Sequence, residues 1–271
     1  MGDTTARGIE ALPTVGAPGP DATSLRQALE RVVERARKSG RRVMSVEVGE
    51  QRFWVKFARG KSCVVQISKG NPRRALAREI ALMRALGGAG APVPELVLHG
   101  EDHYVIRDAG SCLSTLYREA PNDPAMPARF AAAGQALAEM HRKGVAHGRP
   151  YLRDICWQEA TRTVTFIDFE RGARLRAGPA RQARDVALLI MSIYAIRSDA
   201  RGAALAGSCL AAYFAHAPAT MRDACARFAR RWGWLPVLTA PMRWHEVRFR
   251  QDRRWKEYTA VPLALAHLRR G

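Results

Sequence analysis

Apolar positions change their spacing several times along the chain, and each change marks a predicted element. Between residues 25 and 36 they recur every three or four positions, which predicts an amphipathic helix that Gly40 ends. From residue 42 to about 68 the apolar runs become short and rich in β-branched and aromatic residues. This pattern predicts a small antiparallel sheet with strands at 43–48, 52–57 and 63–67.

A second helix is predicted to open at Asn71 and Pro72 and to close at Gly87 and Gly88, with Glu79 in its middle. Two short strands, 96–99 and 104–107, follow it. They end in the sequence 108–110, Asp-Ala-Gly, which suits a hinge.

The rest of the chain is predicted to be mainly helical. A helix of about 15 residues ends near Lys143, a strand covers 164–169, and an apolar helix covers 184–191. We therefore predict an α+β, bilobal chain with a small β-rich first lobe that carries one key helix and a larger helical second lobe. The predicted divisions are a flexible arm (1–22), a first lobe with its leading helix (23–110) and a second lobe (111–271).

The loop that starts at Ala146 has the spacing of a kinase catalytic loop. In the kinase pattern, the catalytic base follows a His by two positions and a metal ligand follows it by seven, with a further metal-binding Asp downstream. Counted from His147, these positions hold Arg149, Asp154 and Asp168. A guanidinium cannot accept a proton at neutral pH, so Arg149 cannot act as the base, although it could contact a phosphate.

The other groups that phosphoryl transfer needs are present. Asp168 follows an apolar strand and Asp154 is a hard-oxygen donor, so both are predicted Mg²⁺ ligands, with an Arg153 salt bridge as the alternative for Asp154. Lys56 is the candidate for the ATP phosphates, with Glu79 holding its ammonium. Taken alone, this pair fits a solvated Lys and an ordinary helix Glu better, but the downstream motif reverses that preference.

Three further residues complete the motif. His147 and Asp185 are predicted to be structural, because such residues tie the catalytic loop to the helix beneath it by buried hydrogen bonds. Glu170 stands where Gly is usual, and it fits metal binding and pairing with a neighbouring Arg equally well.

These motifs resemble the protein-kinase-like fold, and within it the bacterial lipopolysaccharide core kinases that phosphorylate heptose or Kdo sugars. The resemblance covers about residues 42–195 and rests on five segments: 53–56 with 59–60, 78–79, 91–94, 147–148 and 167–170. It implies that Lys56, Glu79, Asp154 and Asp168 bind Mg-ATP, with the acceptor near Arg149. The loop of that family usually carries Asp where this chain has Arg149.

Charge and cysteine usage narrow the partners and the compartment. Lys and Arg total 44 against 25 acidic residues, a net charge of +19, so we expect a polyanionic partner, with coding bias towards Arg as the alternative explanation. Five cysteines without a C-x-x-C pair argue against a disulfide framework or a structural zinc site and favour a reducing cytoplasm. We expect neither a signal peptide nor a membrane span.

The C-terminal region mixes basic and aromatic residues between 243 and 258. A helix packed by its aromatics is the favoured interpretation, and a surface for an acidic glycolipid at the membrane interface is the second. RNA binding would suit the same mixture.

Two functions follow in near balance, with a slight preference for the first because the metal-binding and phosphate-binding residues are present. The first is an ATP-dependent phosphotransferase acting on a lipopolysaccharide core sugar or related anionic acceptor, at the inner face of the cytoplasmic membrane. The second is a pseudokinase that serves as a nucleotide-binding or scaffold module, which Arg149 favours. Nucleic-acid binding rests on charge alone and is the weakest.

Overall fold

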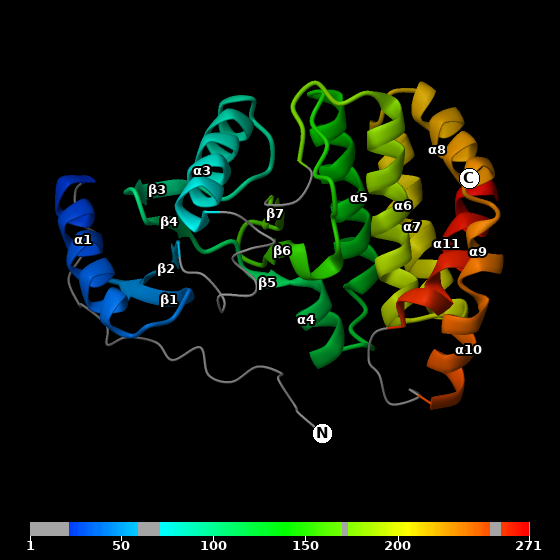
Figure 1. Ribbon diagram of the computed structural model, residues 1–271, viewed down its shortest axis with the longest axis horizontal. Helices are drawn as coiled ribbons and strands as arrows, with labels where there is room; N and C mark the ends of the chain where they lie inside the picture. Colours follow the sequence, from blue (N-terminus) through cyan, green and yellow to red (C-terminus); the bar gives the residue numbers. More distant parts are fainter. Residues whose placement is uncertain (1–21, 59–70, 170–172, 250–255, 271) are drawn as a thin grey trace. The chain divides into compact units, whose positions relative to one another are not determined.

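A computed structural model describes residues 22–58, 71–169, 173–249 and 256–270 (Figure 1). The chain forms two compact units. The first consists of the chain up to Gly88 together with Pro94–Asp108, and the second consists of Ala89–Val93 together with the chain from Ala109 onward. The predicted arm lies outside the described residues except for Ala22, and the predicted strand 63–67 lies outside them entirely.

The first unit is a four-stranded antiparallel sheet with two helices. Its strands run in the order β1-β2-β4-β3. Gly49, with φ +60°, helps the chain turn within two residues between the first two strands. The elements are α1 (Ala22–Lys38), β1 (Val43–Val48), β2 (Gln51–Phe57), α3 (Pro72–Gly88), β3 (Leu96–His99) and β4 (His103–Arg107).

Helix α1 covers one face of this sheet. Its apolar stripe forms a core with Phe53, Val55 and Phe57 of β2 and with apolar residues of the other three strands. Because side chains alternate along a strand, Lys56 faces the opposite side of the sheet, where helix α3 lies. The alternation of β2 thus separates core residues from a charged residue one position away.

The second unit is mainly helical and contains a three-stranded antiparallel sheet in the order β5-β6-β7. A short 3₁₀ helix, Leu152–Asp154, precedes β6. The elements are β5 (Ser111–Cys112), α4 (Leu113–Glu119), α5 (Met126–Arg142), β6 (Ile155–Gln158), β7 (Thr163–Phe166), α6 (Pro179–Ile196), α7 (Ala200–His216), α8 (Thr220–Arg231), α9 (Leu235–Leu238), α10 (Ala240–Phe249) and α11 (Glu257–Arg270).

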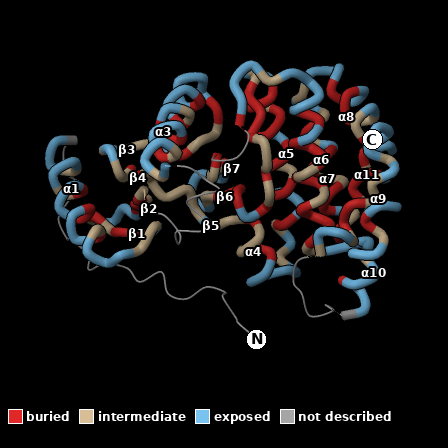
Figure 2. The backbone as a smooth tube through the Cα atoms, in the orientation of Figure 1, coloured by how far each residue is buried: buried red, intermediate tan, exposed pale blue. Residues whose placement is uncertain are grey.

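Helix α6 is the centre of the second unit, and it packs against α7, α8 and α11. Figure 2 shows its buried residues together with those of α5. Gly134 lets α5 approach α7 closely, because a Cβ atom there would lie 2.0 Å from the carbonyl oxygen of Cys209. No helix among the described residues combines the length and apolar character needed to cross a bilayer.

The predicted α+β class is confirmed, with antiparallel strands concentrated in the first unit. The strand predicted at 164–169 ends at Phe166, and β6, which pairs with it, was not predicted. The prediction that the C-terminal aromatics pack inside is wrong for Trp244, whose exposed fraction is 63%.

Candidate functional site

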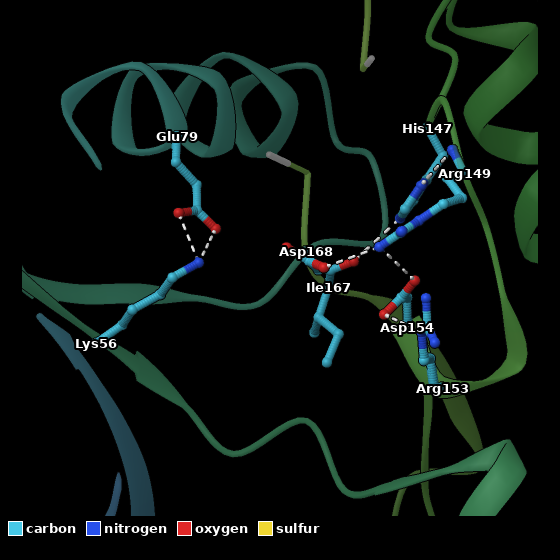
Figure 3. A network of polar contacts seen from close by, with 8 residues as sticks. All are labelled: Lys56, Glu79, His147, Arg149, Arg153, Asp154, Ile167 and Asp168. Atoms are coloured by element: carbon cyan, nitrogen blue, oxygen red, sulfur yellow. Dashed lines mark hydrogen bonds and ion pairs between the residues drawn. The ribbon is translucent and has the colours of Figure 1, made fainter. Parts of the chain in front are cut away.

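Lys56 and Glu79 form a buried ion pair in the first unit. The Lys56 Nζ lies 2.9 Å and 2.8 Å from the two carboxylate oxygens of Glu79 on α3 (Figure 3). The side chains are only 12% and 3% exposed, so the pair is shielded from the screening that weakens surface ion pairs. The prediction that Glu79 holds the Lys56 ammonium agrees with this geometry.

Tyr104 is a third member of this group. It lies opposite Lys56 on the neighbouring strand β4, and its hydroxyl donates to Glu79 Oε1 at 2.9 Å. The Lys56 Nζ lies 5.7 Å from the centre of the Tyr104 ring, within the range of cation–π attraction. Glu79 is therefore oriented by two donors, and its carboxylate in turn fixes the position of the Lys56 ammonium.

In the second unit, Asp185 of α6 holds the backbone of the predicted catalytic loop. Its fully buried carboxylate accepts hydrogen bonds from the backbone N–H of His147 at 2.6 Å and of Gly148 at 2.9 Å. Gly148 has φ +91°, a conformation that Gly adopts without strain. His141 Nε2 lies 3.5 Å from the same carboxylate.

The His147 ring links the loop to the end of the next strand. Its Nε2 donates to the carbonyl oxygen of Ile167 at 3.1 Å, and its Nδ1 accepts from the backbone N–H of Arg149 at 3.3 Å. Burial lowers the pKa of His147, so the ring is held neutral, as this pairing of one donor and one acceptor requires. These contacts are of the structural kind predicted for His147 and Asp185, whose roles stay predictions.

Arg149 lies between the two predicted metal-binding carboxylates (Figure 3). One of its terminal nitrogens is 3.3 Å from Asp168 Oδ2 and 3.7 Å from Asp154 Oδ2. Its guanidinium carbon also lies 5.4 Å from the centre of the Tyr151 ring. The residue at the position of the catalytic base therefore supplies a positive charge to both aspartates.

Asp154 is buried without full compensation. Its side chain is 7% exposed, and Oδ2 has no hydrogen-bond donor among the described residues. Burial raises the pKa of Asp154 to about 7, and the carboxylate of Asp168 acts in the same direction, against the opposing charges of Arg153 and Arg149. The predicted Arg153 salt bridge is present but long, with 3.9 Å between Nε and Oδ1.

Asp168 sits on a strained stretch of backbone. Its φ is +62°, in the left-handed region that residues with a Cβ rarely adopt. Its side chain is 37% exposed, so its carboxylate is accessible to a ligand. Strain of this kind is found where a functional group must be held in a particular direction.

Two carboxylates are enough to fit the usual way that proteins hold Mg²⁺. This ion is typically bound by one or two carboxylates, with phosphate oxygens and water filling its other positions. The orphaned Oδ2 of Asp154 and the carboxylate of Asp168, which face the same guanidinium, match this donor set. No cluster of three or more metal-binding side chains occurs within the described ranges, which exclude Glu170.

The structure brings together most of the predicted site residues within each unit. Lys56 contacts Glu79, and Arg149 joins Asp154 to Asp168. Sequence reasoning missed Tyr104 and Tyr151. Their contacts depend on strand register in the first case and on the path of the loop in the second, neither of which a single sequence reveals.

Two family models match overlapping parts of the chain. The model described as the phosphotransferase enzyme family matches residues 42–154, and that of the lipopolysaccharide kinase (Kdo/WaaP) family matches residues 111–204. Each match covers less than half of the chain, so the first part of the chain is similar to phosphotransferases and the middle part to lipopolysaccharide kinases.

Two individual proteins resemble parts of the chain at low sequence identity. An uncharacterized protein of Haemophilus influenzae is 26% identical over 136 residues, which span 50% of this chain and 55% of that protein. The solved structure of the bifunctional kinase-methyltransferase WbdD shares 15% identity, with a TM-score of 0.40. The similarity covers 63% of this chain and 42% of the WbdD chain. The chain thus matches only about half the length of these two proteins.

Proposed function

We propose that this chain is an ATP-dependent kinase that phosphorylates a hydroxyl group of an anionic sugar or glycolipid. Lys56, oriented by Glu79, would bind phosphate oxygens of ATP, and Asp154 and Asp168 would hold Mg²⁺. Lipopolysaccharide core sugars are the acceptor class suggested by the second family match. Use of ATP favours a location in the cytoplasm, and a glycolipid acceptor favours the inner face of the membrane.

The observation that carries this proposal is the Asp154 and Asp168 pair. A buried carboxylate oxygen without a donor is unfavourable in a protein interior unless another group binds it. Bound Mg²⁺ would supply charge neutralisation for the phosphates. The residues of the chain would do the rest: Lys56 would bind phosphate oxygens, and Asp185 would keep the loop in shape.

Arg149 does not remove the basis for catalysis. Phosphoryl transfer depends chiefly on positioning and charge stabilisation, so a base is not its largest contribution. The guanidinium is 26% exposed and lies beside the two predicted metal-binding carboxylates. It can therefore contact an incoming phosphate or an anionic acceptor. Arg149 would then act as a binding residue in the place of a base.

Calorimetric titration with Mg-ATP tests the nucleotide assignment. We expect binding to wild type that requires Mg²⁺ and that is lost in Asp168→Asn. Asp223→Asn is the matched control, because it removes an exposed acid from α8 in the same unit. Absence of Mg-ATP binding to the wild type would contradict the proposal. Transfer of labelled phosphate to purified core oligosaccharide then tests the acceptor class.

A second candidate function is a pseudokinase, favoured by the bridge that Arg149 makes between both carboxylates. In that case Arg149 replaces the metal, and the chain binds partners or nucleotide without transferring phosphate. Arg149→Ala separates the two functions. An enzyme that uses Arg149 loses phosphate transfer in this variant, whereas a pseudokinase shows no transfer in either form and gains Mg²⁺ affinity when the competing cation is removed.

A further inference from the structure

The segment 234–242, which comprises Trp234, α9 and the start of α10, presents a stripe of large apolar side chains to solvent. Trp234, Val237, Leu238 and Met242 are 52%, 77%, 60% and 49% exposed. Their spacing of three, one and four positions places them along one side of a helix. We call these four residues the apolar stripe. In Figure 2, α10 is drawn mostly in the colour of exposed residues.

The stripe is continuous because the helical hydrogen bonding crosses the junction of the two helices. The backbone N–H of Thr239 donates to the carbonyl oxygen of Leu235, and the backbone N–H of Arg243 donates to the carbonyl oxygen of Thr239, both at 2.9 Å. The helical hydrogen-bond pattern therefore continues through Thr239, which lies between α9 and α10. Residues before and after it can be placed on common faces.

The same helical segment buries two polar residues. Thr239 and Glu246 are 7% and 3% exposed. Glu246 accepts hydrogen bonds from the backbone N–H and the hydroxyl of Thr259, at 2.9 Å and 3.1 Å, and from the backbone N–H of Tyr258 at 3.3 Å. The segment thus buries polar side chains and exposes large apolar ones, the reverse of what is usual for a surface helix. Contiguous exposed apolar surface of this kind marks an interaction site.

The chain segment that carries the apolar stripe is rich in cations. The segment 227–248 contains five arginines, at positions 227, 230, 231, 243 and 248, and a single acidic residue. That acid is Glu246, which is buried and already hydrogen-bonded. The surface of this segment therefore combines exposed Trp and aliphatic side chains with cations and lacks an exposed acid.

We propose that the apolar stripe docks the protein onto the surface of an anionic lipid bilayer. Trp side chains favour the membrane interface, and aliphatic side chains such as Val237 and Leu238 can enter the boundary of the acyl chains. Arginines beside them meet anionic headgroups while their methylene stems lie along the apolar layer. This inference concerns a surface of the second unit and holds whether or not the phosphotransfer proposal is correct.

Charge and side-chain type argue against two other occupants. A symmetric dimer through the stripe would bring the same surface of two copies together, and their arginines would face each other without exposed acids from this segment to pair with them. Nucleic acid would contact the arginines and could stack on Trp234, but Val237, Leu238 and Met242 offer neither stacking nor hydrogen bonds to bases. A bilayer uses both components of the surface.

Vesicle flotation with the full chain tests the proposal. We expect the wild type to float with vesicles of phosphatidylglycerol and phosphatidylcholine and to bind pure phosphatidylcholine vesicles more weakly. The double variant Val237→Glu, Leu238→Glu should lower the partition coefficient about ten-fold or more, because it replaces two membrane-facing apolar groups by anions. Leu175→Glu is the matched control, since Leu175 is 45% exposed and lies outside the stripe.

A second measurement places the stripe in the bilayer without relying on the double variant. Lipids brominated on their acyl chains should quench part of the wild-type Trp fluorescence, and Trp234→Phe should remove much of that quenching. The proposal is overturned if the wild type stays in solution with anionic vesicles, or if the folded double variant floats as well as the wild type. A dimer that forms without lipid and is abolished by the double variant would instead assign the stripe to a second copy.

Discussion

Asp154→Asn should remove part of the pH dependence of stability. Asp154 is 7% exposed, and burial raises its pKa from the ordinary value of 3.8 to about 7. A carboxyl group with a raised pKa in the folded state is tolerated there as the neutral acid. It stabilises the fold relative to an ionised group at low pH, and this contribution is lost as the pH rises through the folded-state pKa.

The magnitude follows from the size of the shift. Each pKa unit corresponds to about 1.4 kcal/mol, so the difference between 3.8 and about 7 sets an upper bound of ~4 kcal/mol. The loss begins near the unfolded-state pKa and is complete above the folded-state pKa. Asparagine keeps the shape of the side chain and does not ionise, so this contribution to the pH dependence disappears in the variant.

Urea unfolding in metal-free buffer measures the effect. Between about pH 5 and about pH 8, the free energy of unfolding of the wild type should fall by ~2–3 kcal/mol more than that of Asp154→Asn. Asp223→Asn, which removes an exposed acid, should follow the wild-type profile. Parallel profiles for the wild type and Asp154→Asn would refute the account of Asp154 as an uncompensated buried carboxyl.

Three further predictions concern residues of the second unit. Asp185→Ala should destabilise the fold by about 2–5 kcal/mol in urea unfolding, because the backbone N–H groups of His147 and Gly148 lose their acceptor. Equal hydrogen-exchange rates of these two amides in the wild type and the variant would contradict this. Gly134→Ala should lower the free energy of unfolding by about 1–3 kcal/mol. Gly207→Ala should raise it by about 0.5–1 kcal/mol, because a Cβ there meets no described atom within 4 Å. Changes of the same sign in both variants would be inconsistent with close packing of α5 on α7. Asp168→Gly should leave stability unchanged or raise it by up to ~1 kcal/mol while abolishing Mg-ATP binding, and retained binding measured by calorimetry would exclude Asp168 as a metal ligand.

The secondary structure that follows from periodicity was predictable. The stripe of α1, the alternation of β2 and the Pro-to-Gly bounds of α3 are local patterns, and each element formed where its pattern stood. Helix α6 runs from Pro179 to Ile196, well beyond the predicted 184–191, because its first turns bury polar residues such as Gln182 that an apolar pattern does not mark. Strand β6 is short and gains its stability from pairing with β7, which a local pattern does not express.

The members of the site were predictable, but their contacts were only partly so. Motif spacing singled out Asp154, Asp168 and Arg149, and the prediction allowed Arg149 a phosphate contact. It did not foresee that Arg149 lies beside both carboxylates. That arrangement depends on the path of the loop after Gly148 and on the left-handed conformation of Asp168, both of which arise from tertiary structure.

Two unfavourable features of the second unit coincide at the same guanidinium. Asp154 has a buried oxygen without a hydrogen-bond donor among the described residues, and Asp168 has a left-handed backbone. Arg149 lies 3.7 Å and 3.3 Å from their carboxylate oxygens, so a single cation faces both acids. If Arg149 had simply replaced the metal in an inert scaffold, nothing would oppose substitutions that relieve these features, since Asn and Gly would serve stability better. The two aspartates beside an arginine therefore fit the proposed kinase site, in which Arg149 would help to bind phosphate.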